Sequence, residues 1–275
     1  MSGAISVHHG PFGRAALYDL NTALTTHVHR EGHLIFYIDG AEGLVTVGDQ
    51  PLRIDTSQAV AVSPWEPHSF KPADPGQSCL CLVLYIMPMW FLETSRSAEF
   101  ALSFGRPAIP LTPEIERWVT RLTSVLLEHQ PSNRFDGFLF EATQACFDES
   151  WRGVGAQPLL RSAHARFNDY RVRRSLRLMQ ESFTEDVVID HLARDVGLSR
   201  PHFFKLFKMQ MGITPNLFLN TLRTEQAIGD LMGTRKSVTD IGFDLGFSSQ
   251  ASFTRFFTSN VGIPPTEYRR VAHIA

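Results

Sequence analysis

The stretch that decides the fold occurs twice: Ile189-Asp-His-Leu-Ala-Arg-Asp-Val-Gly197-Leu198-Ser199 and, further along the chain, Val238-Thr-Asp-Ile-Gly-Phe-Asp-Leu-Gly246-Phe247-Ser248. Each copy has an amphipathic helical pattern followed by glycine, an apolar residue and serine. Glycine is typical of the left-handed residue that ends a helix, and serine is typical of the cap that begins the next one. Two short helices joined by such a turn form a helix-turn-helix.

The helices predicted after the two turns match as well. With one residue inserted near Ser248-Ser249, the copies superimpose at Phe203 and Phe253, Lys205 and Arg255, Phe207 and Phe257, Gly212 and Gly262, and Pro215 and Pro265. Aromatic, basic, glycine and proline positions therefore repeat together, which indicates a duplicated unit. We expect one helix, starting at Thr214-Pro215 and running to about Asp230, to join the two units.

The second helix of each unit is predicted to have a buried aromatic face and an outward face that is left to solvent or to DNA. The outward residues expected to contact DNA are Arg200, Pro201, Phe204 and Lys205 in the first copy, and Gln250, Ala251, Thr254 and Arg255 in the second. Arginine and lysine can address guanine edges or phosphates, and glutamine can address adenine. Because the same outward position is basic in both copies, the pattern favours DNA contact over an ordinary solvated face. Two helices that enter the major groove on one side of a duplex must lie about 34 Å apart.

Charge is divided unevenly along the 275 residues. Residues 161–275 contain 16 Lys and Arg against 11 Asp and Glu, whereas residues 1–160 contain 10 against 17. A basic half favours nucleic acid as the partner of that half. The apolar fraction of 43% and the charged fraction of 20% are those of a globular protein, and the length suits two domains.

No segment of the sequence suggests a membrane or secretory protein. The most apolar run, Cys79 to Leu92, is too short to span a bilayer and contains Pro88. The N-terminus lacks the basic, apolar and small-residue progression of a signal peptide. The three cysteines make no disulfide framework. We therefore expect a cytoplasmic protein with no membrane contact.

The N-terminal half has a different pattern, in which short apolar runs alternate with Gly, Pro, Asp and Ser from about residue 15 to residue 86. The runs are Ala15–Leu20, Leu34–Asp39, Leu44–Val47, Ala59–Val62 and Leu80–Ile86. This spacing predicts an antiparallel sandwich or barrel. Thr112-Pro113 then marks a helix start, and apolar stripes predict two helices over about 113–150. These helices could pack on their own domain or form a dimer seam, and the sequence leaves both open.

Together these patterns predict the fold class α+β. An N-terminal antiparallel β-barrel with a helical segment is expected over residues 1–152, and a linker without periodicity over 153–166. An all-α domain, with two helix-turn-helix units joined by a helix, is expected over 167–275.

The C-terminal motif resembles the AraC/XylS family of transcription regulators over about residues 168–272. The family pattern appears here as Gly246-Phe247-Ser248, Phe253, Arg255, Phe257, Gly262, Pro265 and Tyr268-Arg269, together with the spacing of Arg223, Ala227 and Leu231. The resemblance implies a sequence-specific DNA-binding regulator with two recognition helices in adjacent major grooves, rather than an enzyme. Its base-facing positions would be Pro201, Phe204, Lys205, Ala251, Thr254 and Arg255. The chain departs from the family at Gly242, where alanine is usual and where glycine costs a helix up to about 1 kcal/mol.

Four histidines fall within the strand-rich region, at His27, His29, His33 and His68. Their arrangement looks like a cupin barrel, the effector domain common in that family. A cupin metal site uses His-x-His, a glutamate four residues later and a distant histidine, and here His33 stands where the glutamate would be. Four imidazoles suit zinc, nickel or another borderline divalent ion.

The histidines have three interpretations that the sequence leaves open: they hold a divalent metal, they line a pocket for an organic effector, or they have no ligand role. Glu31, Tyr37 and Trp65 are expected as further pocket members. The expected partners are double-stranded DNA, a small-molecule effector or metal ion, a second copy in a homodimer, and RNA polymerase. The competing function is a cupin metalloenzyme fused to a DNA-binding module, with Glu31 and Glu66 as acid–base candidates.

Overall fold

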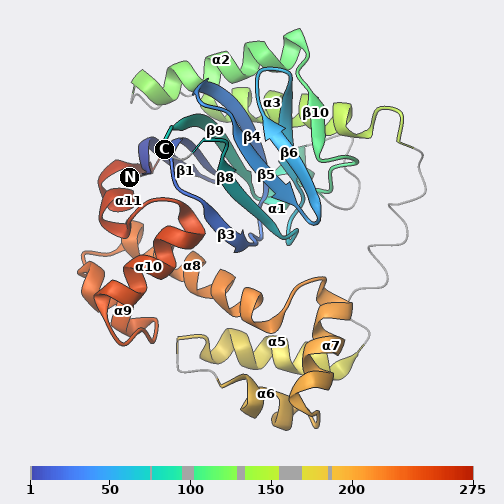
Figure 1. The fold of residues 1–275 in the computed structure, drawn as a ribbon, viewed down its shortest axis with the longest axis vertical. Helices are drawn as coiled ribbons and strands as arrows, with labels where there is room; N and C mark the ends of the chain where they lie inside the picture. Colours follow the sequence, from blue (N-terminus) through green and yellow to red (C-terminus); the bar gives the residue numbers. More distant parts are fainter. Residues whose placement is uncertain are drawn as a thin grey trace. The chain divides into compact units, whose positions relative to one another are not determined.

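The computed structural model describes residues 2–74, 76–94, 102–128, 134–154, 169–184 and 188–274 (Figure 1). The chain forms two compact units, one made of residues 1–154 together with 258–275, and the other of residues 155–257. The expected domain of residues 167–275 is thus divided, because its last residues group with the N-terminal unit. The predicted linker over 153–166 lies outside the described residues from residue 155 onward.

The first unit is built on a seven-stranded sheet in the order β10-β7-β4-β9-β2-β1-β11. Its strands are β1 (Gly3–Gly10), β2 (Gly13–Leu20), β4 (Gly32–Gly40), β7 (Gln58–Val62), β9 (Cys79–Ile86), β10 (Ala108–Pro110) and β11 (Ala272–Ile274). Neighbouring strands are antiparallel, except that β1 and β11 run parallel. The end of the chain therefore extends the sheet that its beginning forms.

A second sheet has four antiparallel strands in the order β3-β8-β5-β6. Its strands are β3 (Leu24–His27), β8 (His68–Pro72), β5 (Gly43–Val47) and β6 (Gln50–Ile54). Residues of both sheets line one common cavity. The two sheets therefore enclose an interior, which is the arrangement that the strand pattern predicts.

The five predicted strands are all present, each within two residues of its expected bounds. Some of the other strands escape a search for apolar runs because their buried positions are partly polar. In β8, for example, alternate residues are buried, but the first of them is His68. In β1 the two histidines His8 and His9 interrupt the apolar pattern.

Three helices of the first unit follow the strands: α1 (Pro88–Thr94), α2 (Pro113–Glu128) and α3 (Phe135–Trp151). Helix α2 begins where its cap predicts, because Thr112 Oγ1 accepts a hydrogen bond from the backbone N–H of Ile115 at 3.3 Å. The break predicted at 131–133, between the two longer helices, lies outside the described residues.

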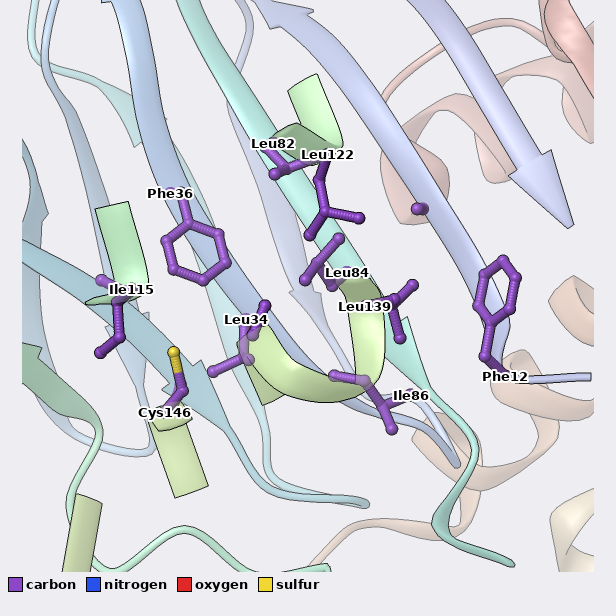
Figure 2. Packing of buried hydrophobic residues seen from close by; sticks show 14 of the residues in the cluster. Phe12, Leu34, Phe36, Leu82, Leu84, Ile86, Ile115, Leu122, Leu139 and Cys146 are labelled. Atoms are coloured by element: carbon purple, nitrogen blue, oxygen red, sulfur yellow. The ribbon is translucent and has the colours of Figure 1, made fainter. Parts of the chain in front are cut away.

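The apolar stripes of α2 and α3 pack against the seven-stranded sheet. Figure 2 shows the two helices contributing Ile115, Leu122, Leu139 and Cys146, and strands β4 and β9 contributing Leu34, Phe36, Leu82, Leu84 and Ile86. Each large apolar side chain buried in this way stabilises the fold by about 1.5–3 kcal/mol. The predicted stripe residues therefore pack on their own domain and are not free to form a dimer seam.

The second unit is helical. Its helices are α5 (Tyr170–Ser182), α6 (Ile189–Asp195), α7 (Arg200–Met211), α8 (Pro215–Gly233), α9 (Val238–Asp244) and α10 (Gln250–Val261). The last turn of α10 and the following α11 (Pro265–Val271) belong to the first unit. Among the described residues, none of the helices combines the length and the hydropathy that crossing a bilayer requires.

Candidate functional site

The two predicted helix-turn-helix units share one turn geometry. Gly197 and Gly246 have φ values of 74° and 80°, in the left-handed region that glycine adopts without strain. After these glycines, the N–H of Leu198 donates to the carbonyl of Ala193 at 2.8 Å, and the N–H of Phe247 donates to the carbonyl of Gly242 at 3.0 Å. The glycine caps predicted from the repeat are therefore confirmed in both copies.

The second helix starts at a different distance from the turn in each copy. Helix α7 begins at Arg200, directly after Ser199, but α10 begins at Gln250, one position later relative to its glycine. The cap of α10 is Ser249, whose Oγ accepts a hydrogen bond from the N–H of Ser252 at 3.2 Å. The prediction that Ser248 caps this helix is therefore wrong, because the inserted residue moves the helix start.

The aromatic residues of the second helices form the core of each unit. Phe203 and Phe207 in α7, and Phe253 and Phe257 in α10, are fully buried. Their ring centroids are 5.7 Å apart in the first pair and 5.9 Å apart in the second. The two copies thus bury the same face of the helix, and the opposite face remains at the surface.

On α7, the surface residues include three of the four predicted to contact DNA. Arg200, Pro201 and Lys205 are exposed, and Phe204 is half-buried. Arg200 forms an ion pair of 3.0 Å with Asp190, and its Cζ lies 5.5 Å from the centroid of the Phe204 ring. The guanidinium of Arg200 is therefore held by its own unit, whereas Lys205 has no ion-pair partner among the described residues.

On α10, Gln250, Ala251 and Arg255 are exposed and Thr254 is half-buried. Gln250 Oε1 accepts a hydrogen bond from Thr239 Oγ1 at 2.8 Å, and Arg255 Nη2 donates to Ser252 Oγ at 3.3 Å. Lys205 and Arg255, which occupy equivalent positions of the two copies, are thus both exposed cations, as the repeat predicts.

The departure at Gly242 has a packing explanation. A Cβ added to Gly242 would lie 2.9 Å from the Cβ of Phe253, closer than real Cβ contacts allow. The equivalent residue of the first copy, Ala193, is buried as well. Glycine therefore lets α9 approach α10 more closely than an alanine would.

The first unit contains a second candidate site, in which the four predicted histidines come together. His27, His29, His33 and His68 are all buried. Ring centroids lie 4.3 Å apart for His27 and His68, 4.3 Å apart for His33 and His68, and 4.9 Å apart for His27 and His29. His27 and His68 face each other across β3 and β8, so strand pairing explains how distant positions meet.

Three of these histidines could hold a metal ion. His27, His29 and His68 each place a ring nitrogen within 4.8 Å of the other two. Nδ1 of His27 lies 2.7 Å from the carbonyl of Thr25, and Nδ1 of His68 lies 2.9 Å from that of Glu66. Since a carbonyl only accepts hydrogen bonds, each Nδ1 carries the proton and each Nε2 keeps its lone pair.

The third nitrogen fits the same chemistry. Nε2 of His29 is buried and has no hydrogen-bond partner among the described residues. Three imidazole nitrogens with an open position suit zinc, nickel or a related ion. His33 is not part of this set and packs on His68 instead, so the expected set of four ligands becomes three.

Burial keeps the histidines neutral. It lowers the pKa of His27 to about 4, and it lowers the pKa values of His29, His33 and His68 well below the ordinary 6.5. The neighbouring imidazoles lower the pKa of His29 further. At neutral pH the rings therefore have the uncharged form that metal binding requires.

A cavity of about 40 Å³ lies beside the histidines, between the two sheets. Its polar lining includes His27, His33 and His68, and its apolar lining includes Ile35 and Ile54. Such a volume holds about two or three water molecules. The cavity in this form suits an ion with its water better than a large organic molecule.

Glu31, Tyr37 and Trp65 do not line this cavity. The Tyr37 hydroxyl donates to the carbonyl of Gly40 at 2.7 Å, at the end of β4, and so points to its own turn. The backbone N–H of Trp65 donates to the carbonyl of His29 at 2.8 Å, which ties the loop before β8 to the histidines. Glu31 is half-buried and precedes β4. The structure thus brings the histidines together without these three side chains.

Two residues that the sequence did not suggest lie next to the histidines. Arg14, Tyr85 and His33 are neighbours across β2, β9 and β4. The Cζ of Arg14 lies 3.8 Å from the centroid of the Tyr85 ring, which in turn lies 5.1 Å from the ring of His33. Burial raises the pKa of Tyr85 to about 12, and the charge of Arg14 opposes this rise. Only strand register reveals this row, so a single sequence has no signal for it.

Sequence comparison finds relatives for the C-terminal part of the chain. Residues 192–271 match a family model described as a helix-turn-helix domain. Over 102 residues the chain is 38% identical to an uncharacterized HTH-type transcriptional regulator of Staphylococcus aureus (strain COL), a match that covers 37% of this chain and 14% of that protein. It is 26% identical over 98 residues to the lactose operon transcription activator of Staphylococcus xylosus, with 36% of this chain and 35% of that protein covered. The chain thus matches only a minor part of these relatives.

Structural comparison extends the likeness to most of the chain. An apo variant of ToxT from Vibrio cholerae matches with a TM-score of 0.59 at 12% identity, over 94% of this chain and 96% of that one. Wild-type ToxT with a bound unsaturated fatty acid matches with a TM-score of 0.55 at 13% identity, over 94% of each chain. Identities this low show a shared fold, in which a β-sheet region precedes a helical region. With the family match and the two turns described above, residues 192–271 of the chain form a helix-turn-helix domain.

Proposed function

We propose that the chain is a sequence-specific DNA-binding transcription regulator that a small ligand or metal ion controls through the N-terminal barrel. The observation that carries the proposal is the duplicated helix-turn-helix, in which Lys205 and Arg255 occupy the same exposed position of two equivalent helices. Relatives over this segment are named as a transcriptional regulator and an operon activator, which supports the same function.

The two second helices, α7 and α10, would each enter a major groove. Their exposed cations can bind guanine edges or phosphates, and Gln250 can bind adenine. The first copy offers fewer donors at its base-facing positions, because Pro201 and Phe204 carry none. We therefore expect α10 to contribute more to sequence selection, and α7 to contribute mainly contacts with the DNA backbone.

The ligand of the barrel would bind at the buried histidines. Three neutral imidazoles with free nitrogens support a divalent ion such as zinc or nickel, whereas the fatty acid bound to ToxT supports an organic ligand in a protein of the same fold. A homodimer and a contact with RNA polymerase complete the proposal. Because the stripes of α2 and α3 are buried, a dimer would use another surface.

The DNA-binding part of the proposal is tested with Arg255→Ala in the full chain, on a duplex selected from a random pool by the unmodified protein. Loss of a base-reading arginine should weaken binding by about 1–3 kcal/mol, which is roughly 5- to 150-fold. Arg117→Ala is the matched control, because it removes the same charge from an exposed position of α2. Fluorescence anisotropy at several salt concentrations measures both.

Equal affinities of Arg255→Ala and the unmodified protein would contradict the role of Arg255. Failure to select any duplex would contradict the function itself. A steep decrease of affinity with salt is also expected, because about six to ten phosphate contacts cost a factor of about 10³–10⁵ between 50 and 200 mM salt.

A metalloenzyme is the second candidate, and the three-histidine set is the observation that favours it. Metal content after purification and zinc titration by calorimetry test the site, with His29→Ala expected to abolish binding. His191→Ala, at an exposed position of α6, is the control. Bound metal with consumption of dioxygen would favour the enzyme, and bound metal without turnover would favour ligand control of DNA binding.

A further inference from the structure

The C-terminal segment, defined here as residues 258–274, is built into the barrel unit. Strand β11 pairs with β1 in parallel, with Val7 opposite Ala272 and His8 opposite His273. Residues 1–154 and 258–275 form one compact unit. The segment is therefore part of the wall of the barrel, although in sequence it is the end of the second helix-turn-helix.

Polar contacts hold much of this segment. The buried Tyr268 places its hydroxyl 2.8 Å from His9 Nε2, and the N–H of Ala4 donates to Glu267 Oε1 at 3.2 Å. Thr25 Oγ1 donates to the carbonyl of Ser259 at 3.3 Å. Water can replace hydrogen bonds of this kind at a small net cost. Val261, Ile263 and Val271 of the segment are also buried, so a ligand that displaces the segment must replace their apolar contacts with its own.

The segment also contributes to the lining of the cavity beside the histidines. Val261 lines the cavity together with His27, His33 and His68. At the next residue, Gly262, an added Cβ would lie 3.2 Å from Leu20 and 3.5 Å from Leu24, which are lining residues as well. Val261, the last residue of α10, thus forms one side of the space in which a barrel ligand would bind.

The size of the cavity sets a condition on the ligand. The cavity measures about 40 Å³, whereas pockets for small organic ligands measure about 300–1,000 Å³. A metal ion fits the present volume. An organic molecule with an apolar body needs more room, and the side chain of Val261 is the lining element that belongs to the C-terminal segment.

We propose that the C-terminal segment is a displaceable wall, and that an amphipathic organic ligand and this segment compete for the barrel. The polar group of the ligand would face the histidines, and its apolar part would take the place of Val261. Because the segment continues α10, its displacement changes what restrains the second recognition helix. The inference rests on the proposed ligand control and specifies how an organic ligand would exert it.

The test uses a disulfide that locks the wall in the full chain. Val7→Cys and Ala272→Cys lie opposite each other on β1 and β11. Neighbouring strands are about 4.8 Å apart, within the Cα separation of about 4.4–6.8 Å that a disulfide spans. The three native cysteines are buried, and oxidant-treated unmodified protein controls for them. The probe is 1-anilinonaphthalene-8-sulfonate, an anionic amphipathic dye, titrated by fluorescence.

The dye is expected to bind the reduced protein at least tenfold more tightly than the oxidised one, and reduction should restore binding. In the reduced and unmodified proteins, dye should raise amide exchange in Val271–His273 at least tenfold while the β4–β9 pairing stays protected. Tyr268→Phe, which removes the hydroxyl that contacts His9 and Arg14, should bind the dye more tightly. Equal dye affinity in both redox states, absence of binding, or unchanged exchange in Val271–His273 would overturn the proposal.

These readouts are separate from those for DNA. If the dye competes with the segment but the protein binds no duplex, the displacement of the segment is supported and the proposed DNA-binding function is contradicted. If the protein binds a duplex selectively but the disulfide leaves the dye affinity unchanged, the proposed function is supported and the displacement of the segment is contradicted.

Discussion

The two helix-turn-helix units are alike in their turns and cores and differ at their edges. Both turns have a left-handed glycine and the same closing hydrogen bond, and both second helices bury a pair of phenylalanines. At the edges, Ser237 and Asp240 form a capping box before α9, whereas Val188 before α6 makes no side-chain cap. The comparison shows that the two copies keep the turn glycines and the buried phenylalanines, which packing requires, whereas their helix caps differ.

The two copies also end differently. Gly212 and Gly262 both have positive φ, but a Cβ at Gly212 would meet nothing within 4 Å, whereas one at Gly262 would touch Leu20 and Leu24. The first copy therefore ends at an open surface, and the second ends against strand residues of the barrel unit. Equivalent positions of the two copies can thus have different structural neighbours.

The largest expected effect tests whether the two cores are energetically equal. Phe203→Ala and Phe253→Ala each remove a fully buried ring, so each should lower the free energy of unfolding by about 3–5 kcal/mol. All four tryptophans lie at positions 65, 90, 118 and 151, outside the helix-turn-helix units, so amide exchange of α7 and α10 is the suitable measurement. If only one of the two substitutions lowers the free energy of unfolding, the two cores do not contribute equally to stability.

A smaller effect comes from exchanging the residues at the equivalent positions Ala193 and Gly242. Gly242→Ala brings a Cβ to 2.9 Å from Phe253 and should cost about 1–3 kcal/mol, as overpacking does. Ala193→Gly should cost about 1 kcal/mol through helix propensity alone. Gly229→Ala in α8 is the control, because its Cβ meets nothing within 4 Å, and it should stabilise by about 0.4–1 kcal/mol. Urea denaturation followed by circular dichroism measures all three, and a neutral Gly242→Ala would show that α9 has room to move.

The smallest effect concerns the helix starts. Ser237→Ala removes the side chain that accepts from the N–H of Asp240 at 3.0 Å, and it should cost about 1 kcal/mol. Val188→Ser should stabilise α6 by a comparable or smaller amount, because it supplies the missing cap. Amide exchange in the first turns of α6 and α9 reports both changes. If Val188→Ser has no effect, the two helix starts differ in more than their caps.

Local signals account for the parts of the fold that the sequence predicts well. Thr112 and Pro113 mark the start of α2 because a cap and a first-turn proline act within a few residues. The glycines of the two turns are also local signals, because each one ends the helix that directly precedes it. The error of Ser248 in place of Ser249 arises because a single inserted residue leaves two adjacent serines that pattern alone does not distinguish. In the first copy Ser199 does precede α7, but its side chain makes no capping hydrogen bond.

Long-range pairing accounts for what the sequence does not predict. No periodic pattern indicates that β11 joins β1, because the partners lie at opposite ends of the chain. The same reason explains why Arg14 and Tyr85 were missed beside His33. The four histidines were recognised as a group from their residue type, but which three present nitrogens to one point depends on the register of β3 and β8.

The length of helix α8 has a consequence for the proposed binding to DNA. Its 19 residues form one continuous helix of about 28 Å, in which each residue turns the chain by about 100°. Inserting or deleting a single residue would swing one reading surface a quarter-turn or more out of phase with the other. Only changes near whole numbers of turns, such as seven residues, would keep both surfaces on the same side. Under the proposed function, the distance between the two half-sites in DNA should therefore be fixed for this chain rather than freely adjustable.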